Sequence, residues 1–152
     1  RVKNLLHQTV ILVGLEQEHT KNKKIVDYGY LVFSAAKAYE GFLKNYFYTM
    51  GFISEGVLTD DHFRIGKALN PGLPKRYRDE DWLFDEVSNA CGEELAMFLW
   101  SAWKQGRNMV FHFHNEKPNG MSYKQAVARV ELIFEAIQKA QECEVNFKDR
   151  ED

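Results

Sequence analysis

The sequence predicts an all-α protein, an antiparallel bundle of four to five helices. Apolar residues recur at steps of three and four over several long stretches, which is the spacing that gives a helix one buried face. Only three prolines interrupt the 152 residues, and 45% of the residues are hydrophobic. A chain of this length buries roughly two thirds of its unfolded surface around one core. We therefore expect a single domain over residues 1–152 that needs no disulfide.

Two helices are expected in the N-terminal third. The apolar spacing predicts the first over residues 2–18, although residues 9–13 would also suit a short strand because they are rich in β-branched side chains. A polar linker completes the segment 1–26. Tyrosines, phenylalanines, leucines and valines then form a broad apolar face over residues 27–50. Gly51 follows at a helix-stopping position, so a long second helix is predicted.

A short helix and a loop are expected next. The helix is predicted over residues 60–69, with Asp60 or Asp61 as the N-cap whose side chain accepts a backbone hydrogen bond. Residues 70–78 contain prolines and a glycine, which are typical of a turn. The loop ends in basic and aromatic residues that we expect to be exposed: Lys75, Arg76, Tyr77 and Arg78.

Two further helical stretches precede the segment with the clearest functional signal. The apolar spacing predicts a helix over residues 82–92 and a long helix over residues 93–113. Gly92 either separates them or kinks one continuous helix. Residues 147–152, at the far end of the chain, are expected to form a charged, frayed tail.

Charge and cysteine content exclude several classes of protein. The formal net charge is −2 and the pI is about 6.2, so no overall positive field holds nucleic acid and any such site must be local. Cys91 and Cys143 lack metal-binding spacing, which favours a reducing, cytoplasmic location. The apolar run at Val10–Val13 is too short to span a bilayer. The chain begins with Arg1 rather than Met, as expected for a fragment of a longer protein.

The candidate chemistry lies near the end of the predicted helix over residues 93–113. Arg107 is followed directly by Asn108, and His112 comes four residues after Asn108. A polar loop separates this Arg-Asn-x-x-x-His motif from the next helix. Ser122 and Gln125 have the spacing of a capping box, in which each side chain bonds the other residue's backbone, so they mark where that helix begins.

This order of elements resembles the HEPN superfamily. The hallmark of that superfamily is an Arg, usually followed by a polar residue, with a His four to six residues after the Arg, and Arg107, Asn108 and His112 match it. The helix that contains Glu40 further resembles toxins of the RNase LS type. The likeness covers roughly residues 28–142. It implies a helical bundle, a homodimer whose two motifs face each other, RNA as the substrate and no cofactor.

The residue types suit RNA cleavage without a metal ion. This reaction needs a group that takes the 2′-hydroxyl proton and a cation that stabilises charge on the phosphate. With a pKa of about 6.5, His112 suits the first role, and Arg107, which stays charged, suits the second. The expected products carry a 2′,3′-cyclic phosphate and a 5′-hydroxyl. On one α-helix Arg107 and His112 point roughly 140° apart, which makes an awkward site within a single chain. The resemblance implies the remedy, a cleft to which both chains of the dimer contribute residues.

The resemblance assigns supporting roles to further residues. Asn108 would orient His112 or touch the phosphate, and Glu40 would position Arg107 by an ion pair. From the residues alone, the default interpretation of Glu40 is an ordinary surface ion pair with Lys37 or Lys44, which lie at helical spacing from it. The chain would be a toxin or phage-defence component, with an antitoxin protein as a further partner and no membrane contact. Apart from the resemblance, basic and aromatic residue types predict a substrate-binding set that could guide an RNA strand: Lys75, Arg76, Tyr77, Arg78 and His114.

The same residues also suit roles that involve no RNA cleavage. An Arg and a His in the last turns of a helix interact favourably with its C-terminal dipole, with no catalytic purpose. The segment His112–His114 with Glu116 suggests a metal site, but alternating ligands need extended backbone and a fourth ligand. Residues 75–78 equally suit a solvated turn. A non-catalytic interaction or dimerisation module is the alternative function, with the large aromatic content supplying interface area.

Overall fold

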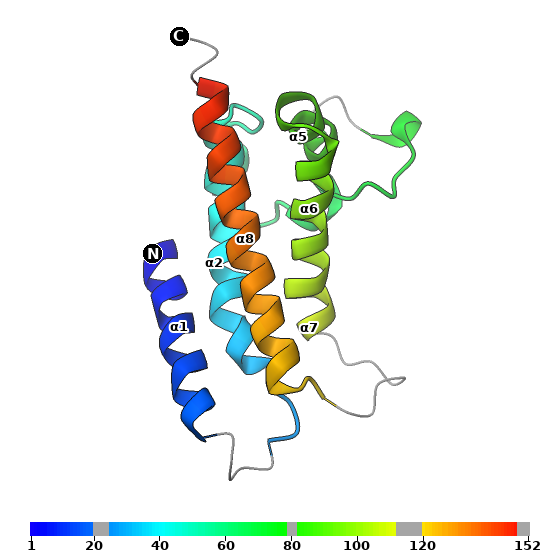
Figure 1. The fold of residues 1–152 in the computed structure, drawn as a ribbon. Helices are drawn as coiled ribbons and strands as arrows, with labels where there is room; N and C mark the ends of the chain where they lie inside the picture. Colours follow the sequence, from blue (N-terminus) through cyan, green and yellow to red (C-terminus); the bar gives the residue numbers. More distant parts are fainter. Residues whose placement is uncertain (20–24, 79–81, 112–119, 149–152) are drawn as a thin grey trace. The chain divides into compact units, whose positions relative to one another are not determined.

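The computed structural model describes residues 1–19, 25–78, 82–111 and 120–148 (Figure 1). Every regular element among these residues is helical and none of them forms a strand, which confirms the all-α class. The chain divides into two compact units. One comprises Arg1–Tyr39 with Ala102–Glu135, and the other comprises Glu40–Ser101 with Ala136–Asp152.

The first unit is built around α1 (Val2–His19), the start of α2 (Tyr30–Thr49) and the start of α8 (Tyr123–Lys148). The hydroxyl of Tyr123 on α8 donates a hydrogen bond of 3.1 Å to the backbone oxygen of Val13 on α1. Residues 9–13, the alternative strand, lie inside α1. The helices with residues in this unit are α1 (Val2–His19), α2 (Tyr30–Thr49), α6 (Glu93–Trp103), the π-helical turn η2 (Lys104–Asn108), α7 (Met109–Phe111) and α8 (Tyr123–Lys148).

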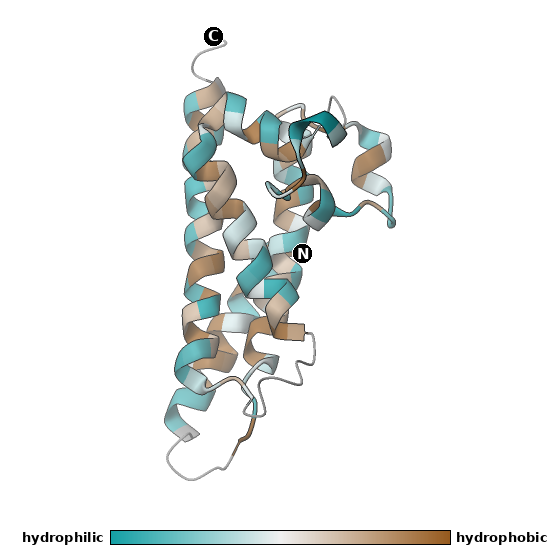
Figure 2. Cartoon of the chain, turned by 90° about the vertical axis from the view of Figure 1, so that its right-hand side faces the viewer, coloured by the Kyte–Doolittle hydropathy of each residue, from teal (hydrophilic) through white to brown (hydrophobic). Residues whose placement is uncertain are grey.

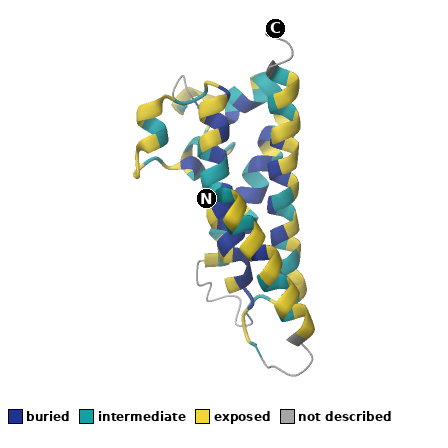
Figure 3. Cartoon of the chain, turned by 90° about the vertical axis from the view of Figure 1, so that its left-hand side faces the viewer, coloured by how far each residue is buried: buried dark blue, intermediate teal, exposed yellow. Residues whose placement is uncertain are grey.

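The second unit contains the rest of α2, α6 and α8 together with several short helices. In Figure 2, hydrophobic and hydrophilic residues alternate along the helices, and Figure 3 shows buried and exposed residues alternating in the same way along α8. This alternation is the one-sided burial that the sequence spacing predicts. The elements found only here are α3 (Glu55–Thr59), α4 (Ile65–Ala68), the 3-10 turn η1 (Lys75–Tyr77) and α5 (Leu83–Cys91).

Three helix boundaries follow local rules that are visible in the sequence. Gly51 has φ of 75°, and the backbone N–H of Phe52 bonds the oxygen of Phe47 at 2.8 Å, which closes α2. Gly92, with φ of 93°, separates α5 from α6, so the two predicted stretches are distinct helices.

At the start of α8 the predicted capping box is confirmed. The N–H of Gln125 donates to Ser122 Oγ at 3.3 Å, and the N–H of Ser122 donates to Gln125 Oε1 at 2.9 Å.

Two predicted boundaries are wrong. The helix expected over residues 60–69 is reduced to α4, because Asp60 does not cap it: its Oδ1 accepts the N–H of His62 at 2.8 Å and forms a local turn instead. The short helix α3, capped by Ser54, was not expected. At the other end α8 continues through Lys148, beyond the expected start of the frayed tail, and residues 149–152 lie outside the described residues.

Cys91 and Cys143 form a disulfide, although the sequence predicts a core large enough to need none. Cys91 is the last residue of α5 and Cys143 lies in α8, and their Cα atoms are 5.9 Å apart. A separation of 52 residues in sequence conceals this proximity, because pairing depends on how the helices pack. The cysteines therefore no longer favour a reducing compartment.

The helix expected to run to residue 113 is interrupted by the π-helical turn η2. Gly106 in this turn is buried, and a methyl group added there would lie 2.8 Å from two side-chain carbons of Ile133 on α8. A hydrogen bond between Arg129 of α8 and Gln105 of the turn reinforces the same contact. Only glycine therefore allows α8 to approach η2 this closely.

Replacing Gly106 with alanine should destabilise the protein. The added methyl group must displace Ile133, and overpacking of this kind lowers the free energy of unfolding by about 1–3 kcal/mol. Gly14→Ala on α1 is the matched control, since nothing lies within 4 Å of its added carbon. There the better helix propensity should raise the free energy of unfolding by up to about 1 kcal/mol. Chemical denaturation measures the free energy of unfolding of both variants. Equal effects of the two substitutions would contradict the close contact between Gly106 and Ile133.

Candidate functional site

Arg107 and Asn108 occupy the end of the π-helical turn η2, and both are half-buried. The guanidinium carbon of Arg107 lies 4.8 Å from the centroid of the Trp103 ring, one turn earlier. This is a cation–π contact, which restricts the orientations of the arginine. Single π-helical turns within α-helices are often found at functional sites, because the extra residue changes which side chains share a face.

Trp103 is itself held in the core of the first unit. Its side chain is buried, and its ring centroid lies 6.4 Å from that of Tyr39 on α2. Tyr39 is fully buried, and this burial raises the pKa of its hydroxyl well above the usual value, so the phenol remains neutral. Arg107 thus rests on a buried tryptophan whose aromatic neighbour Tyr39 is uncharged.

His112 and His114 lie outside the described residues, but both ends of the segment that contains them are positioned. Before it, the rings of Phe111 and Phe33 meet edge to face with centroids 5.8 Å apart. After it, a methyl group added to Gly120 would lie 2.5 Å from the backbone oxygen of Val26, so the chains pass in close contact. The residues on either side of the segment are therefore fixed to the same stretch of the first unit, residues 26–33.

Glu40 is half-buried and belongs to α2, in the part of that helix assigned to the second unit. Arg107 belongs to the first unit. The ion pair expected between Glu40 and Arg107 therefore stays a prediction.

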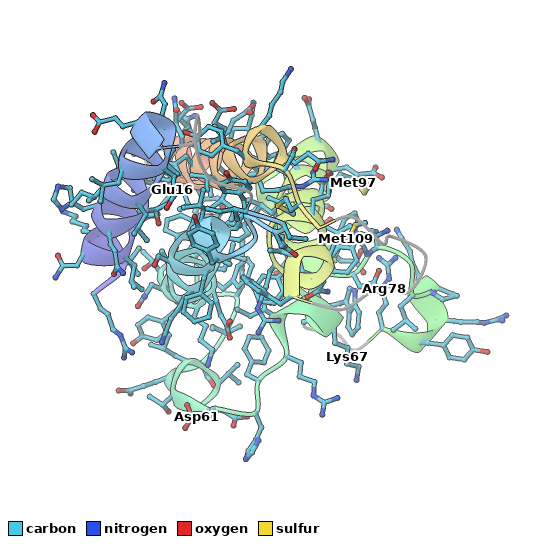
Figure 4. The ribbon with its side chains drawn as sticks, turned by 90° about the horizontal axis from the view of Figure 1, so that it is seen from below. Glu16, Asp61, Lys67, Arg78, Met97 and Met109 are labelled. Atoms are coloured by element: carbon cyan, nitrogen blue, oxygen red, sulfur yellow. A yellow bond between two sulfur atoms is a disulfide. The ribbon has the colours of Figure 1, made fainter. Side chains whose placement is uncertain are left out.

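The basic loop divides into two parts with different surroundings. Lys75, Arg76 and Tyr77 form the exposed 3-10 turn η1, where the Arg76 guanidinium carbon lies 4.8 Å from the Tyr77 ring centroid. Arg78, labelled in Figure 4, was expected to be exposed, but this prediction is wrong, because only 8% of its side chain is accessible to solvent. It forms an ion pair with Asp85.

The guanidinium of Arg78 holds the loop together. Its Nε donates to the backbone oxygen of Leu73 at 2.6 Å, and its Nη2 donates to that of Pro71 at 2.7 Å. Because these two donors bond the loop itself and Nη1 bonds Asp85 on α5, Arg78 has a structural role. Lys75, Arg76 and Tyr77 present the basic and aromatic surface that binding to an RNA strand would require.

Neither a metal cluster nor a membrane span is found within the described ranges. These residues contain no group of three or more His, Cys, Asp and Glu side chains placed to hold a metal ion. The suggested metal ligands His112, His114 and Glu116 lie outside those ranges. None of the helices described is long and apolar enough to cross a bilayer. No protein-family model, curated protein or solved structure matches the chain significantly.

Two features of this site were not predicted from the sequence. The contact between Trp103 and Arg107 was visible as a spacing of four residues, which places side chains on one helix face. The π-helical turn was not visible, because a single additional residue in one turn leaves the apolar spacing on either side intact.

Arg78→Ala and Arg76→Ala should differ sharply in stability. Removing Arg78 leaves the Asp85 carboxylate and two loop carbonyls without their partner, and we expect the free energy of unfolding to fall by about 2–3 kcal/mol. Removing the exposed Arg76 should change it by less than about 0.5 kcal/mol. Urea denaturation of both variants tests this, and a neutral Arg78→Ala would contradict the structural role.

Proposed function

We propose that the chain is a metal-independent endoribonuclease of the HEPN type, acting as a homodimer. The observation that carries the proposal is the placement of Arg107 and Asn108 in a π-helical turn, with Arg107 stacked on the buried Trp103. An arginine held in this way loses little side-chain freedom when it binds a phosphate. More of the binding energy is therefore available to stabilise the negative charge on the phosphate oxygens than with a freely moving arginine. A toxin or phage-defence role, with an antitoxin partner, belongs to the same proposal.

The proposed reaction is attack of an RNA 2′-hydroxyl on the adjacent phosphate. His112 takes the hydroxyl proton and returns a proton to the departing 5′-oxygen, while Arg107 stabilises the charge on the phosphate oxygens. Asn108 orients His112 or the phosphate, and Glu40 positions Arg107. Lys75, Arg76 and Tyr77 of η1 offer a basic and aromatic surface for the strand, to which the proposal adds His114.

The homodimer has support from the exposed apolar residues beside the motif. Phe33 is 56% exposed, Phe111 44% and Met109 36%, although Phe33 and Phe111 contact each other. Met109 immediately follows Asn108 and is labelled in Figure 4. Large exposed apolar side chains gathered in this way are typical of protein interfaces.

The test is cleavage of a mixed RNA pool by the purified chain in EDTA. We expect products with 2′,3′-cyclic phosphate and 5′-hydroxyl ends. Arg107→Ala and His112→Ala should each reduce the rate by at least about a hundredfold, because each removes a group that acts in the transition state. Arg64→Ala and His62→Ala are matched controls at exposed positions of the second unit. Full activity in the folded Arg107 or His112 variant would refute the proposal.

The second candidate is a non-catalytic interaction or dimerisation module. The same exposed residues, Phe33, Met109 and Phe111, favour it, since they suit an interface without requiring a reaction. A dimer with no effect on RNA would favour this candidate over the first.

Sedimentation of the wild-type chain and of a Phe33→Ser, Phe111→Ser double variant tests the interface that both candidates use. We expect a dimer for the wild type and a monomer for the double variant, because the change removes the exposed ring pair. Tyr48→Ser, at an exposed aromatic of the second unit, should remain dimeric. A wild-type monomer over the whole concentration series, or a dimeric double variant with unchanged helix content, would contradict the prediction.

A further inference from the structure

The Cys91–Cys143 disulfide lies at an open surface cavity of about 300 Å³ in the second unit. Both cysteines line the cavity and both are half-buried rather than enclosed. A disulfide in the core is protected because an attacking thiol cannot reach it. This one is reachable, so its environment decides which molecules react with it.

The wall of the cavity carries charges of both signs. Lys139 lines it, with its ammonium nitrogen 5.3 Å from the centroid of the Phe98 ring, which also lines it. Glu94 and Glu142 add carboxylates to the same wall. A small thiol that bears both carboxylates and an ammonium group matches this arrangement, since Lys139 attracts the former and the glutamates attract the latter.

The two sulfur atoms have different surroundings. The hydroxyl of Tyr46 lies 3.3 Å from Cys91 Sγ, and because a disulfide sulfur carries no hydrogen, the hydroxyl is the donor. Tyr46 is 2% exposed, and burial raises the pKa of its hydroxyl, so it remains a donor. A hydrogen bond to Cys91 stabilises the negative charge that this sulfur acquires when the disulfide breaks.

We propose that the disulfide is a thiol-exchange site for zwitterionic low-molecular-weight thiols, and that Cys143 is the sulfur attacked. The thiol first loses its proton to solvent. Its thiolate then attacks Cys143 Sγ, a new S–S bond forms there, and the old bond breaks with its electron pair remaining on Cys91 Sγ. Tyr46 donates its hydrogen bond to the resulting thiolate.

A second thiol completes the exchange. Its thiolate attacks the small-molecule sulfur of the mixed disulfide and releases Cys143 as a thiolate. The two cysteines take up two protons from solvent, so the protein disulfide is reduced by two electrons while two thiols are oxidised to one disulfide. The covalent link between the end of α5 and α8 is then lost.

Reduced glutathione is the probe for the purified full chain. The chain is incubated with it, alkylated with N-ethylmaleimide at short times, and digested for mass spectrometry of the cysteine peptides. We expect glutathione on Cys143 and the maleimide on Cys91. Glutathione mainly on Cys91, or two free thiols in protein purified without reductant, would overturn the proposal.

Variants test the two recognition features separately. Tyr46→Phe should slow the reaction roughly fivefold, because it removes one hydrogen bond to the leaving sulfur. Tyr48→Phe, on the same helix, should leave the rate unchanged.

Lys139→Gln should slow the reaction with glutathione but not the reaction with uncharged 2-mercaptoethanol. Lys124→Gln, also on α8, should slow neither reaction. Wild-type rates for Tyr46→Phe, or equal slowing of both thiols by Lys139→Gln, would refute these roles.

Discussion

The close approach of Gly106 to Ile133 is the constraint on which the arrangement around the motif depends. A side chain at position 106 would occupy the space of the isoleucine, so α8 can pack here only because the turn carries a glycine. The Arg129–Gln105 hydrogen bond lies at the same contact. Arg107 therefore follows a residue whose position is set by packing on another helix. A functional side chain gains precision from a rigid support of this kind.

Three arginines of this chain show how surroundings decide the role of one residue type. Arg107 stacks on a buried tryptophan, Arg76 stacks on an exposed tyrosine, and Arg78 directs its donors to its own loop and to Asp85 on α5. The planar guanidinium permits all three, because it bonds in its plane and stacks on its face. Sequence spacing assigns Arg76 and Arg78 to one basic surface, whereas their hydrogen bonds and exposure separate them.

The parts of the fold that follow local rules could be predicted, and those that follow tertiary contacts could not. The Ser122–Gln125 capping box and the glycine end of α2 depend on neighbouring residues only, and both are found where expected. The turn at Asp60 was not predicted, because an aspartate side-chain oxygen can accept a backbone N–H either at a helix start or in a local turn, and the residue type does not distinguish the two. The Cys91–Cys143 disulfide depends on two helices meeting, which apolar spacing does not encode. Within the site, the motif locates Arg107 and Asn108, but the π-helical turn leaves no mark in the apolar spacing, and its close contact with Ile133 depends on how two helices pack.

The two units differ in the interactions that hold α8 to its neighbours, and they should therefore respond differently to a thiol reductant. In the first unit the contacts of η2 with α8 are packing and hydrogen bonds, which a thiol reductant leaves untouched. In the second unit the end of α5 is joined to α8 by a covalent bond that closes a long loop, which is worth roughly 4 kcal/mol in chain entropy. Reduction of this disulfide therefore lowers the stability of the second unit and leaves the η2–α8 contacts of the first unit unchanged. Because α8 contributes residues to both units, its C-terminal half can lose its covalent tie while its N-terminal half keeps the contacts that support Arg107.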